Sequence, residues 1–264
     1  MIRNNFSGNG VHLKNQIAFA AILAPALAFA MATPALAGSP GMGGEVYGAT
    51  VEKGEVELET RYGRLTGGAN GGEDVMKLEA AYGVTDRLRL AIVGEFGREP
   101  GDSRRLNAAA IEAIYALGNA AGIDFAVYGE YEQAFDGPNE LEAKLLMQHR
   151  SGPWDLRLNL IAGKELAADA PVELGYAASA DLAVAKPLRL GFEAYGNLGT
   201  FSQFGPSVEH YAGPIAKIRL LTSDPDGDGD DHGGLTLTTG YLFALGATRE
   251  QTDGQLHLKL EMEF

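Results

Sequence analysis

The sequence predicts an all-β fold, a transmembrane antiparallel up-and-down β-barrel of about 12 strands. Three observations favour it: long runs in which charged and apolar residues alternate, turn signals between the runs, and an apolar leader at the start. The 264 residues are 45% hydrophobic and 21% charged, and the mean hydropathy is −0.07. Strands that are half apolar and half charged give such a near-zero average.

The first 37 residues are typical of a cleaved signal peptide. Arg3 and Lys14 precede an apolar stretch over 17–32, and the small-residue site Ala35-Leu36-Ala37 follows. An uncleaved membrane anchor is the alternative, which the small-residue site disfavours. Cleavage removes two bases and no acid, so the mature chain is more acidic than the full chain, whose net charge is −14. Residues 38–53 are then expected to be an N-terminal periplasmic segment, and 54–264 the outer-membrane β-barrel.

The first strand is predicted over 54–66. In Glu55-Val56-Glu57-Leu58-Glu59-Thr60-Arg61-Tyr62 the odd positions are charged and the even ones are mostly apolar. A period of two gives a strand one wet face and one apolar face, whereas a helix would scatter these residues around its axis.

The same alternation predicts eleven further strands. Turn signals such as Pro100-Gly101-Asp102 and Asp136-Gly137-Pro138-Asn139 separate them. Each is long enough to cross a bilayer as a tilted strand, which takes about 9–11 residues. Ten or fourteen strands remain alternatives, because 172–185 and 208–220 alternate weakly. The runs are 74–85, 87–98, 104–118, 122–134, 140–150, 153–165, 172–185, 188–199, 208–220, 234–247 and 254–264.

A soluble β-sandwich is the competing architecture. The barrel is favoured because the strands exceed the usual ~5–6 residues of globular sheets, and because charge lines the wet face along its whole length. An even strand number places both termini in the periplasm and the longer loops outside. Aromatic residues near strand ends then form interfacial girdles. We expect Tyr82, Tyr115, Trp154, Tyr241 and Phe264 on the periplasmic side and Tyr62, Phe96 and Tyr131 on the outer side.

The wet face is predicted to line a lumen in which acids outnumber bases. A wide lumen of this kind would select solutes by charge, preferring cations or excluding anions. A narrow lumen would pair the same charges across the barrel and close it, as in a non-conducting structural barrel. The two alternatives stay open here. The predicted lumen-lining residues are Glu57, Glu59, Arg61, Lys77, Glu79, Arg89, Glu95, Glu130, Glu142, Lys144, Arg157, Glu193, Lys217, Lys259 and Glu261.

One segment has metal-like spacing. Asp224, Asp226 and Asp228 alternate as in the first half of an EF-hand loop, with Gly229 at the sixth position and Asp230 after it. The twelfth position, which should carry a bidentate acid, is Leu235, so a solvated acidic turn is favoured over a weak Ca²⁺ site. No other cofactor is expected.

An outer-membrane lipid hydrolase is a less favoured alternative. His149 falls on the apolar face near a strand end and Ser151 follows it, but no third catalytic partner is evident. We therefore expect no enzyme. The absence of Cys excludes disulfide scaffolds and Cys-ligated metals, and the acidic balance argues against nucleic-acid binding.

The segment 46–59, with Val51-Glu52-Lys53-Gly54-Glu55 at its centre, resembles the opening of an uncharacterised family of Gram-negative outer-membrane β-barrels. The segments 82–87, 94–96 and 192–196 resemble the same family, and the chain is broadly similar to the MetA-pathway phenol-degradation transporter group. The last strand, closed by Phe264, resembles the signal that the barrel-assembly machinery reads. The resemblance implies a small monomeric barrel in outer-membrane lipid, with a transport role for an unspecified small solute and no catalytic residues.

Overall fold

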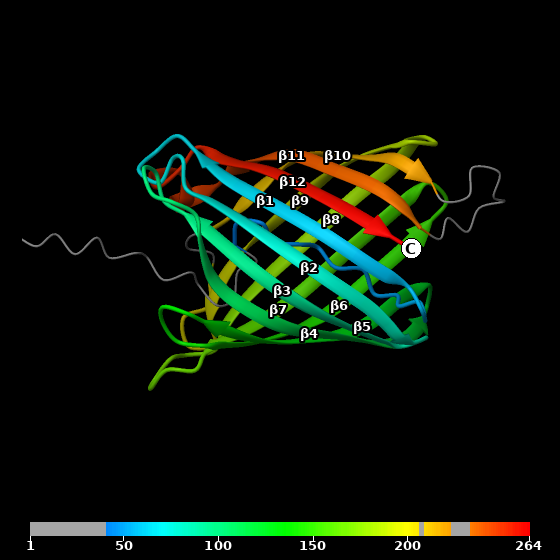
Figure 1. The fold of residues 1–264 in the computed structure, drawn as a ribbon, viewed down its shortest axis with the longest axis horizontal. Helices are drawn as coiled ribbons and strands as arrows, with labels where there is room; N and C mark the ends of the chain where they lie inside the picture. Colours follow the sequence, from blue (N-terminus) through cyan, green and yellow to red (C-terminus); the bar gives the residue numbers. More distant parts are fainter. Residues whose placement is uncertain (1–40, 206–208, 223–232) are drawn as a thin grey trace, which may run out of the picture. The chain divides into compact units, whose positions relative to one another are not determined.

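The computed structural model describes residues 41–205, 209–222 and 233–264. In them, twelve antiparallel strands form a closed barrel in which each strand pairs with its chain neighbours and β1 pairs with β12 (Figure 1). The predicted fold class is confirmed. The strands are β1 (Val56–Thr66), β2 (Asp74–Thr85), β3 (Leu88–Arg98), β4 (Arg105–Ala120), β5 (Ile123–Ala134), β6 (Glu140–Ser151), β7 (Trp154–Glu165), β8 (Glu173–Ala185), β9 (Leu188–Thr200), β10 (Tyr211–Thr222), β11 (Gly234–Ala244) and β12 (Gly254–Glu263).

Both weakly alternating runs form strands, β8 and β10. In β10 the pairing with β11 is interrupted between Ala212 and Ile215, around Pro214. Proline has no N–H to donate to a neighbouring strand. The predicted strand 234–247 ends earlier, at Ala244, because Gly246 takes a φ of 58° and begins the 3₁₀ helix Gly246–Glu250. No helix in the described part of the chain is long and apolar enough to cross a membrane.

The outer wall of the barrel is apolar. Large hydrophobic side chains point outward from every second position of the strands and stay exposed. A water-soluble domain does not expose a continuous band of this kind, so the wall is built to face lipid. Members of this band are Leu58, Leu78, Leu90, Ile92, Ile111, Val127, Leu145, Leu158, Leu160, Leu190, Phe192 and Leu260.

The two ends of the barrel differ. We call the end with the connections 67–73, 99–104, 135–139, 166–172 and 245–253 the loop end, and the end with the chain terminus Phe264 the turn end. Phe264 closes the barrel at the turn end: its N–H donates to the Val56 carbonyl at 2.9 Å, and Val56 N–H donates back at 3.3 Å. Tyr82, Tyr115 and Trp154 are half-exposed on the outer wall near this end.

The predicted position of Tyr241 is wrong. Its hydroxyl lies 2.6 Å from Thr66 Oγ1, and its ring packs edge-on to Phe243, so it belongs to the loop end. The error follows from the chain direction, because β11 runs from the turn end to the loop end and Tyr241 is near its last residue.

Candidate functional site

The inner face of the barrel carries the charged positions. The structure places all the predicted lumen residues on this face, where many are almost completely buried. Alternation fixes the placement, because successive side chains of a strand point to opposite faces. These residues are Glu57, Glu59, Arg61, Lys77, Glu79, Arg89, Glu95, Glu130, Glu142, Lys144, Arg157, Glu193, Lys217, Lys259 and Glu261.

A non-strand segment, residues 44–50, runs through the lumen between the walls (Figure 1). The sequence predicts a periplasmic segment at 38–53, whereas the structure buries Val46, Tyr47 and Ala49 inside the barrel. We call residues 44–50 the inner segment. Side chains of the barrel wall form hydrogen bonds with its backbone. Tyr47 N–H donates to Asn159 Oδ1 at 2.8 Å, and Asn159 Nδ2 donates to the Tyr47 carbonyl at 3.0 Å. Ala49 N–H donates to Gln148 Oε1 at 3.0 Å.

Tyr47 is the main side-chain anchor of the inner segment. Its ring centroid lies 4.9 Å from that of Tyr128, and Lys144 Nζ lies 4.6 Å above it. Its hydroxyl accepts a hydrogen bond from Arg61 at 3.1 Å and lies 3.3 Å from Glu112 Oε2. The ring therefore combines apolar packing with cation–π contacts that a desolvated site strengthens.

Two inward-facing glycines make room for the chain that leads into and out of this segment. A Cβ on Gly63 would lie 2.6 Å from Gly43 N, and one on Gly83 would lie 1.7 Å from the Glu52 carbonyl oxygen. Glycine inside a strand often marks such a close approach of another backbone. Inward-facing glycines are thus the one signal in the sequence that points to a chain within the barrel.

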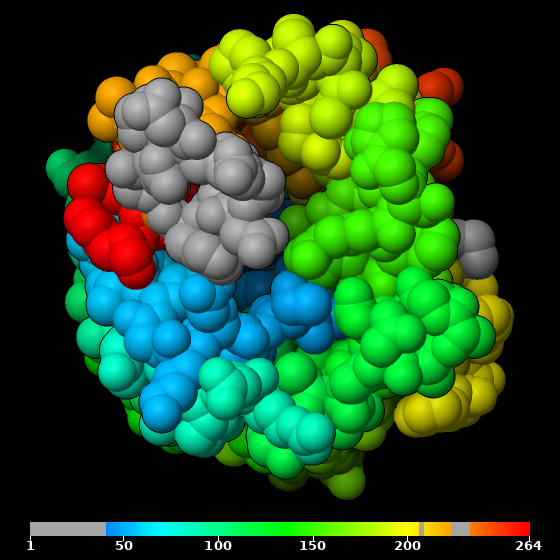
Figure 2. Space-filling model, turned by 90° about the vertical axis from the view of Figure 1, so that its right-hand side faces the viewer, coloured from blue at the N-terminus to red at the C-terminus, as the bar shows by residue number. Residues whose placement is uncertain are grey.

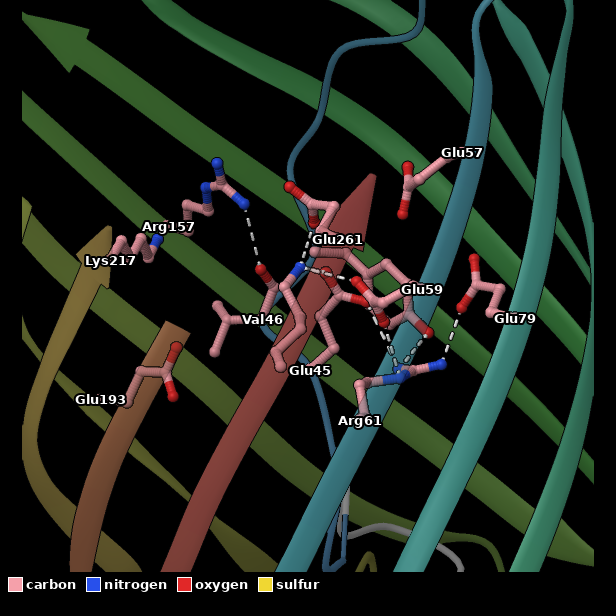
Figure 3. A network of polar contacts seen from close by, with 12 residues as sticks. Glu45, Val46, Glu57, Glu59, Arg61, Glu79, Arg157, Glu193, Lys217 and Glu261 are labelled. Carbon is pink, nitrogen blue, oxygen red and sulfur yellow. Dashed lines mark hydrogen bonds and ion pairs between the residues drawn. The ribbon is translucent and has the colours of Figure 1, made fainter. Parts of the chain in front are cut away.

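Glu45 of the inner segment joins an ion-pair network with β1, β2 and β12 (Figure 3). Arg61 lies 3.3 Å from Glu45, 2.8 Å from Glu59 and 2.7 Å from Glu79. Lys259 lies 2.7 Å from Glu45 and 2.8 Å from Glu59, and also pairs with Glu261.

The carboxylates of Glu45, Glu59 and Glu261 converge closely enough to hold a metal ion. The Lys259 ammonium contacts all three, so the chain already supplies the compensating cation. We assign this cluster to anchoring the inner segment rather than to a metal.

On the opposite wall, Arg157 fixes the inner segment from β7. It donates to the Val46 carbonyl at 3.3 Å and pairs with Asp155 at 3.0 Å. Beyond it, Asp181 is fully buried between Arg189 and Lys217. Removal of one partner from a buried ion pair of this kind strongly destabilises the fold, because the other charge is left buried and unpaired.

The loop-end half of the lumen holds what we call the acidic cluster, Glu95, Glu130, Glu132, Glu140 and Glu142. Glu130 lies directly opposite Glu142 in the pairing of β5 with β6, and Glu132 lies opposite Glu140. Lys77 offsets Glu95 at 3.0 Å and Lys144 offsets Glu142 at 2.8 Å.

Further acids lie in the loops above this cluster. Burial raises the pKa of Glu73, and the charge of Glu99 pushes that pKa in the same direction. Acids directly opposite each other repel, so this half of the lumen carries a negative potential.

The lumen is open on the turn-end side of the inner segment. A cavity of about 490 Å³ is lined there by the inner segment and by charged side chains that include Arg89, Arg150 and Glu263. Figure 2, which faces this end, shows a hollow beside the blue atoms of the first described residues. Between Glu45, Lys217 and His257 a space of only about 20 Å³ remains, about enough for one water. The inner segment is therefore a constriction.

The other predicted site residues are accounted for as follows. Asp224, Asp226, Asp228 and Asp230, the predicted acidic turn or Ca²⁺ site, lie outside the described residues. His149 Nδ1 lies 2.7 Å from the Gly122 carbonyl oxygen, a contact that ties a strand end to the adjacent turn.

Comparison with known proteins supports the fold. No protein-family model matches the chain, and no curated protein matches it in sequence. Among solved structures, the NanC porin superposes with a TM-score of 0.53 at 8% identity, covering 78% of this chain and 98% of that one. An outer membrane channel from Pseudomonas putida F1 superposes with a TM-score of 0.52 at 13% identity, covering 81% and 97%. The chain has the fold of outer-membrane barrels. At this identity the likeness extends to the fold alone.

Proposed function

We propose that this protein is an outer-membrane β-barrel that acts as a narrow passive channel for small solutes, with the inner segment as its constriction. The observation that carries the proposal is the lumen itself. It carries charged side chains over much of its inner face, is open to about 490 Å³ at the turn end, and narrows where residues 44–50 cross it. Towards the loop end, a buried apolar cluster that includes Tyr195, Tyr211 and Leu242 also fills part of the lumen. A barrel that served only as a scaffold would not need an acidic cluster in which five carboxylates outnumber the two paired lysines.

Cation preference follows from the acidic cluster. A solute entering from the loop end passes Glu130, Glu132, Glu140 and Glu142 before it reaches the constriction. Rings of acidic side chains favour cations and repel anions in narrow pores. We therefore assign cations and neutral solutes to this path.

The second candidate is a non-conducting structural barrel. It is favoured by the ion pairs of Arg61 and Lys259, which hold the inner segment in place. A lipid hydrolase is less well supported, since the geometry at His149 shows a backbone contact and no triad among the described residues.

A liposome swelling assay separates these candidates. Proteoliposomes are diluted into isosmotic solutions of arginine, of a small neutral sugar or of glutamate, with protein-free liposomes as the control. The channel proposal expects swelling in arginine and the sugar and much slower swelling in glutamate. No swelling in any solute would favour the structural barrel.

The remaining parts of the proposal concern location and assembly. The outward apolar band suits outer-membrane lipid, and Phe264 at the closing seam suits an assembly signal. We propose a monomer, and the MetA-pathway resemblance remains a prediction. A Phe264→Ala variant should reach the outer membrane in smaller amounts, which membrane fractionation would measure.

A further inference from the structure

The outer wall of the barrel carries a cluster of basic residues at the loop end. Arg64, Asp74 and Arg98 lie in direct register across β1, β2 and β3. The Asp74 carboxylate is fully buried between Arg98 and Arg104, and the Arg104 guanidinium also lies 5.7 Å from the centre of the Tyr62 ring. We call these three arginines with Asp74 the rim cluster.

The guanidinium groups of the rim cluster offer more N–H donors than its single carboxylate can accept. One carboxylate faces three guanidinium groups, and Arg64 is exposed with no ion-pair partner among the described residues. The side chains of Arg98 and Arg104 keep 37% and 28% of their surface exposed. The rim cluster itself therefore has a surplus of positive charge on a strongly acidic protein, with Glu73, Glu99 and Asp102 in the adjoining loops.

An apolar groove of about 610 Å³ lies on the same strands, below the rim cluster. Gly94 and Ala109 pair directly across β3 and β4, and their small size forms its floor. Leu78, Ile92, Ile111 and Tyr131 form its sides. Figure 1 shows β2, β3 and β4 side by side on this wall.

The groove and the rim cluster are aligned along the strands. From the groove floor at Gly94, β3 leads through Phe96 to Arg98, and β4 leads from Ala109 through Leu106 towards Arg104. The four residues from Gly94 to Arg98 span about 13 Å of strand. An arginine side chain can reach back towards the groove, so its guanidinium group can lie closer to the groove than that. A molecule with an acyl chain in the groove would place its headgroup on the guanidinium groups.

We propose that this surface binds a phosphorylated glycolipid of the outer leaflet, lipopolysaccharide, with one acyl chain in the groove and a headgroup phosphate on the rim cluster. Arginine is the side chain best suited to phosphate, because its planar group donates two parallel hydrogen bonds. The charge complementarity selects an anionic lipid, and the position at the loop end selects the outer leaflet. This proposal needs the membrane location but does not depend on whether the lumen conducts.

Native mass spectrometry of the full chain, released from detergent after titration with lipid A, tests the proposal. We expect saturable binding that Arg64→Gln weakens and that the triple variant Asp74→Asn/Arg98→Gln/Arg104→Gln weakens at least tenfold. The triple variant removes the buried acid together with its partners, so no uncompensated charge is left. Gly94→Leu should weaken binding to a similar extent by filling the groove, since a Cβ there meets only Phe96 and Leu106 at 3.5 and 3.7 Å.

Two control variants should bind as the wild type does: Arg87→Gln, an exposed arginine at the turn end, and Ala178→Leu, an outward small residue on β8. Equal losses in the controls would overturn the proposal, as would lipid A binding that none of the site variants changes. Equal binding of phosphatidylglycerol would overturn the choice of lipopolysaccharide. Displacement of lipid A by millimolar inorganic phosphate alone would show that the groove holds no chain.

Discussion

Asn159 holds the backbone of the inner segment through two hydrogen bonds, and its loss should release that segment. The side chain is fully buried and bridges the N–H and the carbonyl of Tyr47 at 2.8 and 3.0 Å. Asn159→Leu keeps similar volume and removes both bonds. Each hydrogen bond contributes about 1 kcal/mol net. Loss of both bonds should therefore lower the free energy of the displaced state, in which the inner segment has left its place, by about 2 kcal/mol relative to the anchored state. Since 1.4 kcal/mol corresponds to a tenfold change, its population should rise roughly thirtyfold.

The chain has no cysteine, so a single Ala49→Cys reports on this release. Ala49 is 2% exposed, and its thiol should react with a bulky polar maleimide only when the segment leaves its place. We expect Asn159→Leu to raise the labelling rate in that proportion. The control is Ser179→Ala, because the buried Ser179 hydroxyl on β8 makes no hydrogen bond to any described residue. A labelling rate that rises less than threefold would refute the anchoring role of Asn159.

Three further changes test other contacts. Gly63→Ala should also speed labelling of Ala49→Cys, because its Cβ would lie 2.6 Å from Gly43 N, whereas Gly129→Ala, with open space around its Cβ, should not. Arg61→Met should lower the free energy of unfolding by about 3–5 kcal/mol in urea titrations, because it leaves buried carboxylates without their cationic partner. The exposed substitution Arg87→Met should leave the free energy of unfolding unchanged. Glu130→Gln/Glu142→Gln should lower the cation-to-anion permeability ratio measured from reversal potentials, and an unchanged ratio would remove the acidic cluster from selectivity. Asp86→Asn, in an exposed turn, is its control.

The strands could be predicted because the polar lumen and the apolar lipid lie on opposite faces of the wall. Successive residues of a strand therefore alternate between polar and apolar side chains. An inward Glu59 followed by an outward Thr60 and an inward Arg61 shows the period of two without knowledge of the partners. Even β10, which contains Pro214, keeps enough of the pattern to be found.

The inner segment could not be predicted from alternation, because its residues form no ladder with a neighbouring strand. Its partners Gln148 and Asn159 are about a hundred residues away in sequence, and their roles depend on the closed barrel. The rim cluster was hidden for a similar reason, since Arg104 comes from a loop and meets Asp74 only through the pairing of β2 with β3 and of β3 with β4. Gly63 and Gly83 were the local sign that another backbone approaches the wall.

Single-channel conductance of the full chain in a planar bilayer, compared with that of Tyr47→Gly, tests the central claim most directly. Tyr47 fills the lumen at the constriction through its contacts with Tyr128 and Lys144. We predict a small cation-selective conductance for the wild type and a several-fold larger one, still cation-selective, for Tyr47→Gly. No conductance in either protein would contradict a channel constricted by its own N-terminal segment.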